Sequence, residues 1–251
     1  MFGDFEPAML DEVAHRPWPL PRAPWVMTQT WHHLLFAHWP LDPAALRPRV
    51  PAELELDVFD GAAWVGIVPF TMSNVAPRGT PALPWVSAFP ELNVRTYVRA
   101  AGKSGVYFFS LDAARALAVL TARTLFALPY FLASMQVETR DGTVHYASRR
   151  MASGVRAELS AAYRAAGAPS APVPGSLEHF LTERYCLFTV DRRRRVSSVE
   201  IHHPPWPLQA AEAEIAINTM ADASGIRLPS RPALLHYARR QDMVAWLPAR
   251  V

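Results

Sequence analysis

The chain has 251 residues, of which 51% are hydrophobic and 19% are charged, and its formal net charge is +3. This composition is too apolar for a disordered protein, and the length allows a substantial core. Arginine supplies all but one of the 25 basic residues and is spread along the chain except for the run 192–195. The sequence therefore indicates no nucleic-acid partner, because aromatic residues interleaved with the arginines and a recognisable nucleic-acid module are both missing.

The single cysteine, Cys186, excludes an internal disulfide and any metal site built from several cysteines. It lies in the apolar run 185–190, where a thiol packs as a small hydrophobic group. The N-terminus contains no apolar stretch of the signal-peptide type, and the longest apolar tract, 113–133, is interrupted by two arginines and a proline. We therefore expect a cytoplasmic protein with no membrane partner.

The first elements in chain order are an arm, a short helix and a hairpin. Residues 1–24 are rich in proline and aperiodic, which predicts an extended arm on a single domain that spans 25–251. Asp42 suits a helix N-cap, with Pro43 in the first turn, and predicts a short helix over 41–47. The strand-like runs 54–59 and 63–70 flank an Asp-Gly dipeptide that suits a tight hairpin turn.

A second hairpin is predicted over residues 90–112. Between residues 92 and 98 the even positions are mostly apolar and the odd positions polar, which is the period of a strand, and 106–111 forms the returning strand. We take a two- or four-residue loop in which Ala101 faces Ser104; a three-residue loop would change the pairs. This register places five polar side chains on one face: Glu91, Asn93, Arg95, Ser110 and Asp112.

Two interpretations of this polar face are open. In the first, Arg95 offers a fork of donors to a carboxylate or an anionic ligand, and Glu91 or Asp112 accepts a proton. In the second, the face is exposed to water, as one face of an antiparallel sheet commonly is.

The second half of the chain continues the pattern of hairpins. Asp112 can cap a helix over 113–128, and a hairpin joins 131–139 to 143–149 through an Asp-Gly turn, with a further strand over 155–163. Ser176 can cap a short helix over 177–183, and strands 185–190 and 196–201 flank an exposed arginine turn. The alanine-rich segment 210–223 predicts a helix, and 233–238 and 243–247 predict the last strands. This order favours a mostly β (α+β) fold, a large antiparallel β-barrel or cone with a few flanking helices.

Histidines and tryptophans form the remaining candidate site residues. His202 and His203 precede Trp206, and adjacent histidines on a strand point to opposite faces, so at most one of them can join a common site with His236. No HExxH motif or other metal-ligand spacing is present, so we expect neither a metal nor a cofactor. The run 204–207 predicts a rigid loop, in which Trp206 either packs in the core or forms the wall of a cavity.

Arg184 directly precedes a predicted strand. It either binds a carboxylate inside the domain or forms a buried ion pair.

Eight sequence blocks in order resemble the YqjF-like family of uncharacterised conserved proteins, over nearly the whole of 25–247. The blocks are LLFAHWP (34–40), FDGAAWVGIVPF (59–70), ELNVRTYV (91–98), GVYFFSLDA (105–113), LPYF (128–131), LTERY (181–185), HHPPWPLQ (202–209) and LLHYAR (234–239). That family is similar in turn to the acetoacetate decarboxylase superfamily, and this similarity implies a large antiparallel barrel around an internal cavity.

The resemblance also raises the question of Schiff-base chemistry, since acetoacetate decarboxylase acts through a buried, neutral lysine. The only lysine here, Lys103, lies at a predicted hairpin tip, where water keeps an ammonium group charged. We therefore expect no Schiff-base decarboxylation. Two functions stay open: a cavity for a small acidic or carbonyl-containing molecule, or a non-catalytic module, in a monomer or a homo-oligomer, whose polar cluster only stabilises the barrel.

Overall fold

The computed structural model describes residues 7–82, 87–115, 128–151 and 156–251. Thirteen strands within these ranges form one sheet, which confirms the mostly β prediction. The strands are β1 (Met27–Leu41), β2 (Glu55–Leu56), β3 (Ala63–Pro77), β4 (Phe89–Ala100), β5 (Lys103–Ala113), β6 (Tyr130–Arg140), β7 (Thr143–Arg150), β8 (Glu158–Ser170), β9 (Cys186–Val190), β10 (Val196–His202), β11 (Leu208–Asn218), β12 (Leu234–Ala245) and β13 (Ala249–Arg250). The described helices are short: α1 (Pro43–Leu46), α3 (Leu177–Thr182) and the 3-10 turns η1 (Pro7–Asp11), η2 (Arg47–Arg49) and η3 (Asp222–Ser224).

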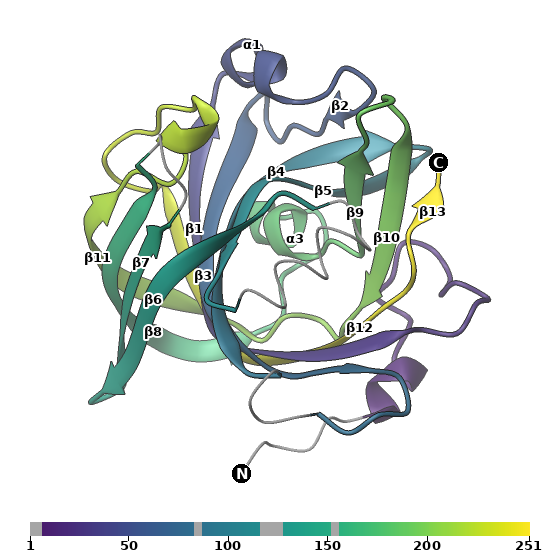
Figure 1. The fold of residues 1–251 in the computed structure, drawn as a ribbon, viewed down its shortest axis with the longest axis horizontal. Helices are drawn as coiled ribbons and strands as arrows, with labels where there is room; N and C mark the ends of the chain where they lie inside the picture. Colours follow the sequence, from purple (N-terminus) through teal and green to yellow (C-terminus); the bar gives the residue numbers. More distant parts are fainter. Residues whose placement is uncertain (1–6, 83–86, 116–127, 152–155) are drawn as a thin grey trace.

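The strand order is β13-β10-β9-β5-β6-β7-β8-β11-β12-β1-β3-β4-β2, and β4 also pairs with β5 and β10 with β12. Most pairs are antiparallel, as a series of hairpins requires, but β5 pairs in parallel with both β6 and β9. In Figure 1 the strands surround α3, with β6, β7, β8 and β11 on the left and β9 and β10 on the right. Strands from distant parts of the sequence therefore face a common interior.

Three two-residue turns set the local hairpin geometry. The dipeptides 60–61, 101–102 and 141–142 each have positive φ at both residues, as the tight turns of β-hairpins require. The turns at 60–61 and 141–142 are the Asp-Gly turns predicted from the sequence. Around the first, however, only Phe59 and Ala62 pair, and the short strand β2 pairs with β4 instead of β3.

The predicted register of the β4–β5 hairpin is wrong. Its loop comprises residues 101 and 102, so Ala100 pairs with Lys103, and a β-bulge opposite Val94 and Arg95 shifts the register again. Leu111 is therefore the partner of Asn93. Because directly opposed residues share a face of the sheet, Ser110 and Asp112 lie on the face opposite to that of Asn93 and not beside it.

The predicted helix over 210–223 is also wrong, because most of that segment is strand β11. Alanine favours helices, but here small and apolar residues alternate with exposed Glu212 and Glu214, and Ala211, Ala213 and Ile215 pack on the core. Pairing with the alanine-rich strand β8 stabilises this segment as a strand. The two strands predicted over 233–247 form one continuous strand, β12.

Several other predictions are confirmed. Asp42 caps α1 by accepting a hydrogen bond from the Ala44 amide at 2.8 Å, and Ser176 caps α3 through the His179 amide at 3.2 Å. Strands β6, β7, β9 and β10 lie where the sequence predicts them. The predicted helix over 113–128 falls mainly on 116–127, outside the described residues, and its expected cap, Asp112, is part of β5.

Residues 7–24 pack against the sheet. Met9 is buried against Val244 and Trp246, and Arg16 donates a hydrogen bond to the Ile201 carbonyl at 2.7 Å. The division of the chain at residue 24 stays a prediction.

Candidate functional site

A cavity of about 500 Å³ is lined by residues from β1, β3, β4, β5, β6, β9, β10 and β12, from α3 and from the loop before β11. Aliphatic, aromatic and methionine side chains make up most of its wall. Its polar and charged lining residues are Gln29, Glu91, Asn93, Arg95, Tyr130, Thr182, Arg184 and His203. A few polar groups in an apolar cavity of this size are typical of a small-molecule site.

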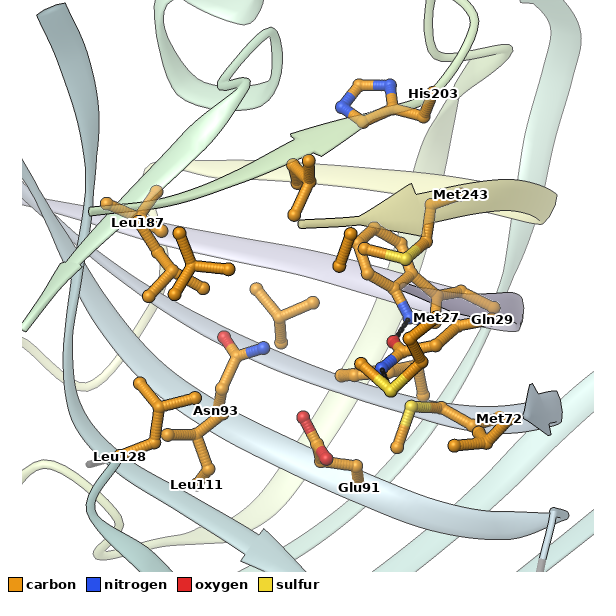
Figure 2. A pocket seen from close by; sticks show the side chains of 18 of the residues that line it. Met27, Gln29, Met72, Glu91, Asn93, Leu111, Leu128, Leu187, His203 and Met243 are labelled. Carbon is orange, nitrogen blue, oxygen red and sulfur yellow. Dashed lines mark hydrogen bonds between the residues drawn. The ribbon is translucent and has the colours of Figure 1, made fainter. Parts of the chain in front are cut away.

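Glu91, Asn93 and Arg95 form a polar row along β4. They alternate along the strand, so they share one face and succeed each other at intervals of about 6.6 Å. All three line the cavity, and Figure 2 shows the side chains of Glu91 and Asn93 directed into it. This face of β4 is therefore enclosed within the protein, whereas the second interpretation above placed it in bulk water.

Glu91 is 3% exposed, and its Oε2 accepts a hydrogen bond from the Tyr130 hydroxyl at 2.8 Å. Burial raises the pKa of this carboxyl group to about 8, the nearby Asp112 also raises it, and the Tyr130 hydrogen bond partly opposes the shift. At neutral pH Glu91 is therefore mainly protonated. In that form it can donate a hydrogen bond, whereas the role of proton acceptor considered above requires the ionised form.

Asn93 and Arg95 have polar atoms without partners. The Asn93 Oδ1 and the Arg95 Nε are both buried and make no hydrogen bond within the described part of the chain. Arg95 donates through Nη2 to the Leu181 carbonyl at 3.2 Å, and its guanidinium lies 5.4 Å from the Phe36 ring centroid. No described carboxylate forms an ion pair with Arg95. A cation without a counter-ion in an apolar cavity favours an anion.

Arg184 differs from Arg95 because it pairs with a buried carboxylate, that of Asp57, which also pairs with the exposed Arg99. The Arg184 Nη1 lies 2.6 Å from the Asp57 Oδ2, and its Nε donates to the Phe180 carbonyl at 2.6 Å. Of the two interpretations of Arg184, the structure contains the buried ion pair. The residue also lines the cavity.

His203 and Trp206 close another side of the cavity. The His203 Nδ1 donates to the Pro204 carbonyl at 2.7 Å, and burial lowers the pKa of the ring to about 4, so the histidine is neutral. Trp206 is 3% exposed and stacks on Trp31 with the ring centroids 5.8 Å apart. Trp206 is thus both a packing residue and a wall of the cavity.

Four candidate residues lie outside the cavity lining. His202 donates to the Met9 carbonyl at 2.8 Å and so holds the N-terminal segment, and His236 lies on β12. Asp112 forms a bidentate pair with Arg150, at 2.7 and 3.1 Å, on the other face of β5. Ser110 shares that face, for the reason of register given above.

Lys103 is also outside the lining. It forms an ion pair with Glu200 and lies 5.2 Å from the Trp18 ring centroid.

Tyr130, Gln29 and Thr182 line the cavity but were not candidates. Tyr130 falls in the LPYF block, although no chemical pattern in the sequence pairs it with Glu91. The Gln29 Oε1 accepts a hydrogen bond from the Trp31 Nε1 at 2.8 Å, as Figure 2 shows. These residues could be recognised only once the fold brings β1, β6 and α3 around β4.

No group of three or more His, Cys, Asp or Glu side chains suited to a metal ion occurs among the described residues. Within the same ranges, no helix is both long and apolar enough to cross a membrane.

Comparisons with known sequences place this chain beside uncharacterised proteins. The model of the family DUF2071, described as an uncharacterized conserved protein, matches residues 28–242. The uncharacterized protein YqjF of Bacillus subtilis (strain 168) is 50% identical over 227 residues, which cover 90% of this chain and 93% of that protein. The predicted resemblance to the YqjF-like family is confirmed.

Solved structures with the same fold have low sequence identity. An acetoacetate decarboxylase-like enzyme from Sphingomonas wittichii RW1 has a TM-score of 0.62 at 13% identity, over 91% of this chain and 94% of that one. Acetoacetate decarboxylase from Legionella pneumophila has a TM-score of 0.61 at 13% identity, over 100% and 98%. The enduracididine biosynthesis enzyme MppR, complexed with pyruvate, has a TM-score of 0.62 at 12% identity, over 91% of both chains. These similarities show an acetoacetate decarboxylase-like fold.

Proposed function

The chain belongs to DUF2071, a family of uncharacterized conserved proteins. We propose that its cavity binds a small acidic or carbonyl-containing molecule and that Arg95 binds the acidic group of this ligand. The observation that carries this proposal is that Arg95 lines the cavity and that its guanidinium has no counter-ion among the described residues. A ligand carboxylate supplies the missing charge and satisfies two parallel donors of the guanidinium.

The neighbours of Arg95 complement the rest of such a ligand. Protonated Glu91 donates a hydrogen bond to a carbonyl oxygen, and the unpaired Asn93 Oδ1 accepts one from a hydroxyl or amide. The pyruvate complex of MppR, whose fold is similar, supports the choice of an oxygen-rich acid. The pairings of β4 with β5 and of β10 with β12 support a sheet that closes into a barrel around the ligand.

Schiff-base catalysis is not part of the proposal. The amine of Lys103 is held by Glu200 and Trp18, and Lys103 is not among the residues that line the cavity. A lysine outside the cavity lining is not placed to attack the carbonyl group of a ligand bound there.

One observation favours the alternative, a polar cluster that only stabilises the fold. Glu91 is already paired with Tyr130, and Arg184 with Asp57, so these four residues need no ligand. Asn93 and Arg95 argue against it, because a purely structural cluster would satisfy the Asn93 Oδ1 and the Arg95 Nε.

Thermal unfolding with a panel of acids tests the proposal. Acetoacetate, pyruvate and octanoate are added to the wild-type chain, to Arg95→Gln and to the control Arg164→Gln, which changes an exposed arginine paired with Glu212. We expect at least one acid to raise the melting temperature of the wild type and the control. Its neutral amide should have a smaller effect than the acid, and Arg95→Gln should reduce the response to the acid. If no acid acts, or if Arg95→Gln responds like the wild type, the proposal is wrong.

A further inference from the structure

The cavity extends well beyond the polar row of β4. On β3, Gly66 pairs with Arg95, Phe70 with Glu91 and Met72 with Phe89. The six steps along β3 from Gly66 to Met72 span about 20 Å. Arg95 therefore lies near one end of this span, and the other end lies beyond Glu91.

The end beyond Glu91 is apolar and rich in methionine. Met27, Met72 and Met243, which we call the methionine end, come from β1, β3 and β12 and all line the cavity. Figure 2 shows them on the far side of Glu91 from Asn93. The polar residue among them, Gln29, has its Oε1 engaged by the Trp31 indole. Methionine side chains are flexible and adapt to apolar ligands of varied shape.

From this arrangement we propose that the ligand is an amphipathic carboxylic acid with an unbranched apolar tail. Its carboxylate binds Arg95, and its tail runs along β4, past Asn93 and Glu91, to the methionine end. This inference rests on the proposed function and specifies the substrate class of the same site.

The size and the charge of the cavity both support a tailed acid. A short keto acid fills only a small part of about 500 Å³ and leaves the methionine end without a partner. Glu91, which the tail must pass, is mainly uncharged at neutral pH and so does not repel an apolar chain. Each methylene group that enters the apolar part gains up to about fourfold in affinity.

Calorimetric titration with a homologous series tests the inference. Acetate, butyrate, hexanoate, octanoate and decanoate are titrated at neutral pH into the full chain, below the concentrations at which they form micelles. We expect the dissociation constant to fall by up to about fourfold for each added methylene group and to level off once the tail fills the cavity. Decylamine, which has the same tail and a positive charge, should bind at least tenfold more weakly than decanoate because Arg95 repels it.

Two variants test whether the apolar tail of the ligand lies at the methionine end. Met72→Gln and Met243→Gln make the methionine end polar, and each should weaken decanoate at least fivefold while leaving the short acids unchanged. Met151→Gln is the control, because Met151 is 65% exposed and away from the cavity. If either variant fails to fold, the titrations of the wild type with the homologous acids still test the inference.

The outcomes separate this inference from the function on which it rests. If pyruvate or acetoacetate binds through Arg95 and lengthening the tail brings no gain, the tailed ligand is wrong and the proposed function survives. If no acid of any length binds, both are wrong. If decanoate and decylamine bind equally, the tail drives binding alone and Arg95 does not hold the carboxylate.

Discussion

Replacement of Glu91 by glutamine removes an ionisation that the folded protein opposes. Burial raises the pKa of Glu91 from 4.5 to about 8. Between these two pH values the folded chain keeps a proton that the unfolded chain has released, so the free energy of unfolding falls as the pH rises. Glutamine has nearly the same shape, keeps an acceptor for the Tyr130 hydroxyl and does not titrate.

The size of the effect follows from the shift in pKa. Each pH unit in this range removes about 1.4 kcal/mol from the stability of the wild type, and the whole interval removes about 5 kcal/mol. The advantage of Glu91→Gln over the wild type should therefore grow with pH until about pH 8 and then stay constant.

Urea unfolding followed by tryptophan fluorescence from about pH 5 to about pH 9 measures this difference. Glu214→Gln on the exposed side of β11 serves as the control and should keep the wild-type profile. Parallel profiles for the wild type and Glu91→Gln would refute the assignment of a raised pKa to Glu91.

Three further results are expected. Borohydride added with acetoacetate should leave the intact mass unchanged, and an adduct on Lys103 would overturn the exclusion of Schiff-base chemistry. Asp112→Asn leaves the guanidinium of Arg150 buried without its counter-ion, so urea unfolding should show a loss of about 3–5 kcal/mol; a loss below about 1 kcal/mol, as for the exposed pair of Glu212, would contradict the buried pair. Octanoate binding, measured by calorimetry, should weaken as the pH rises through about 8, because ionised Glu91 repels the ligand carboxylate. Glu91→Gln should abolish this pH dependence. Equal pH profiles for the wild type and Glu91→Gln would count against Glu91 as a neighbour of the ligand.

Local sequence patterns were sufficient to predict the hairpin turns, the helix caps and the polar face of β4. Asp-Gly dipeptides predict tight turns because both residues tolerate positive φ, and Ser176 predicts the start of α3. The alternation at 91, 93 and 95 places three polar side chains on one face regardless of register. For this reason these three residues line one cavity even though the predicted pairing of β4 with β5 is wrong.

The predictions that were wrong depend on how strands distant in the sequence pair with one another. A single bulge in β5 moves Ser110 and Asp112 to the other face, and no residue type in the sequence marks its position. Segment 210–223 has the alanine content of a helix, but its alternating pattern and its pairing with β8 and β12 favour a strand over 210–218. The contact of Tyr130 with Glu91 joins β6 to β4, so it depends on strand order and not on spacing.

The most direct test of a carboxylate site at Arg95 is a crystal structure of the protein with octanoate. We expect a carboxylate within hydrogen-bond distance of the Arg95 guanidinium and a tail directed past Glu91. Octanoate bound on the surface, or a cavity in which a protein carboxylate already pairs with Arg95, would contradict this expectation.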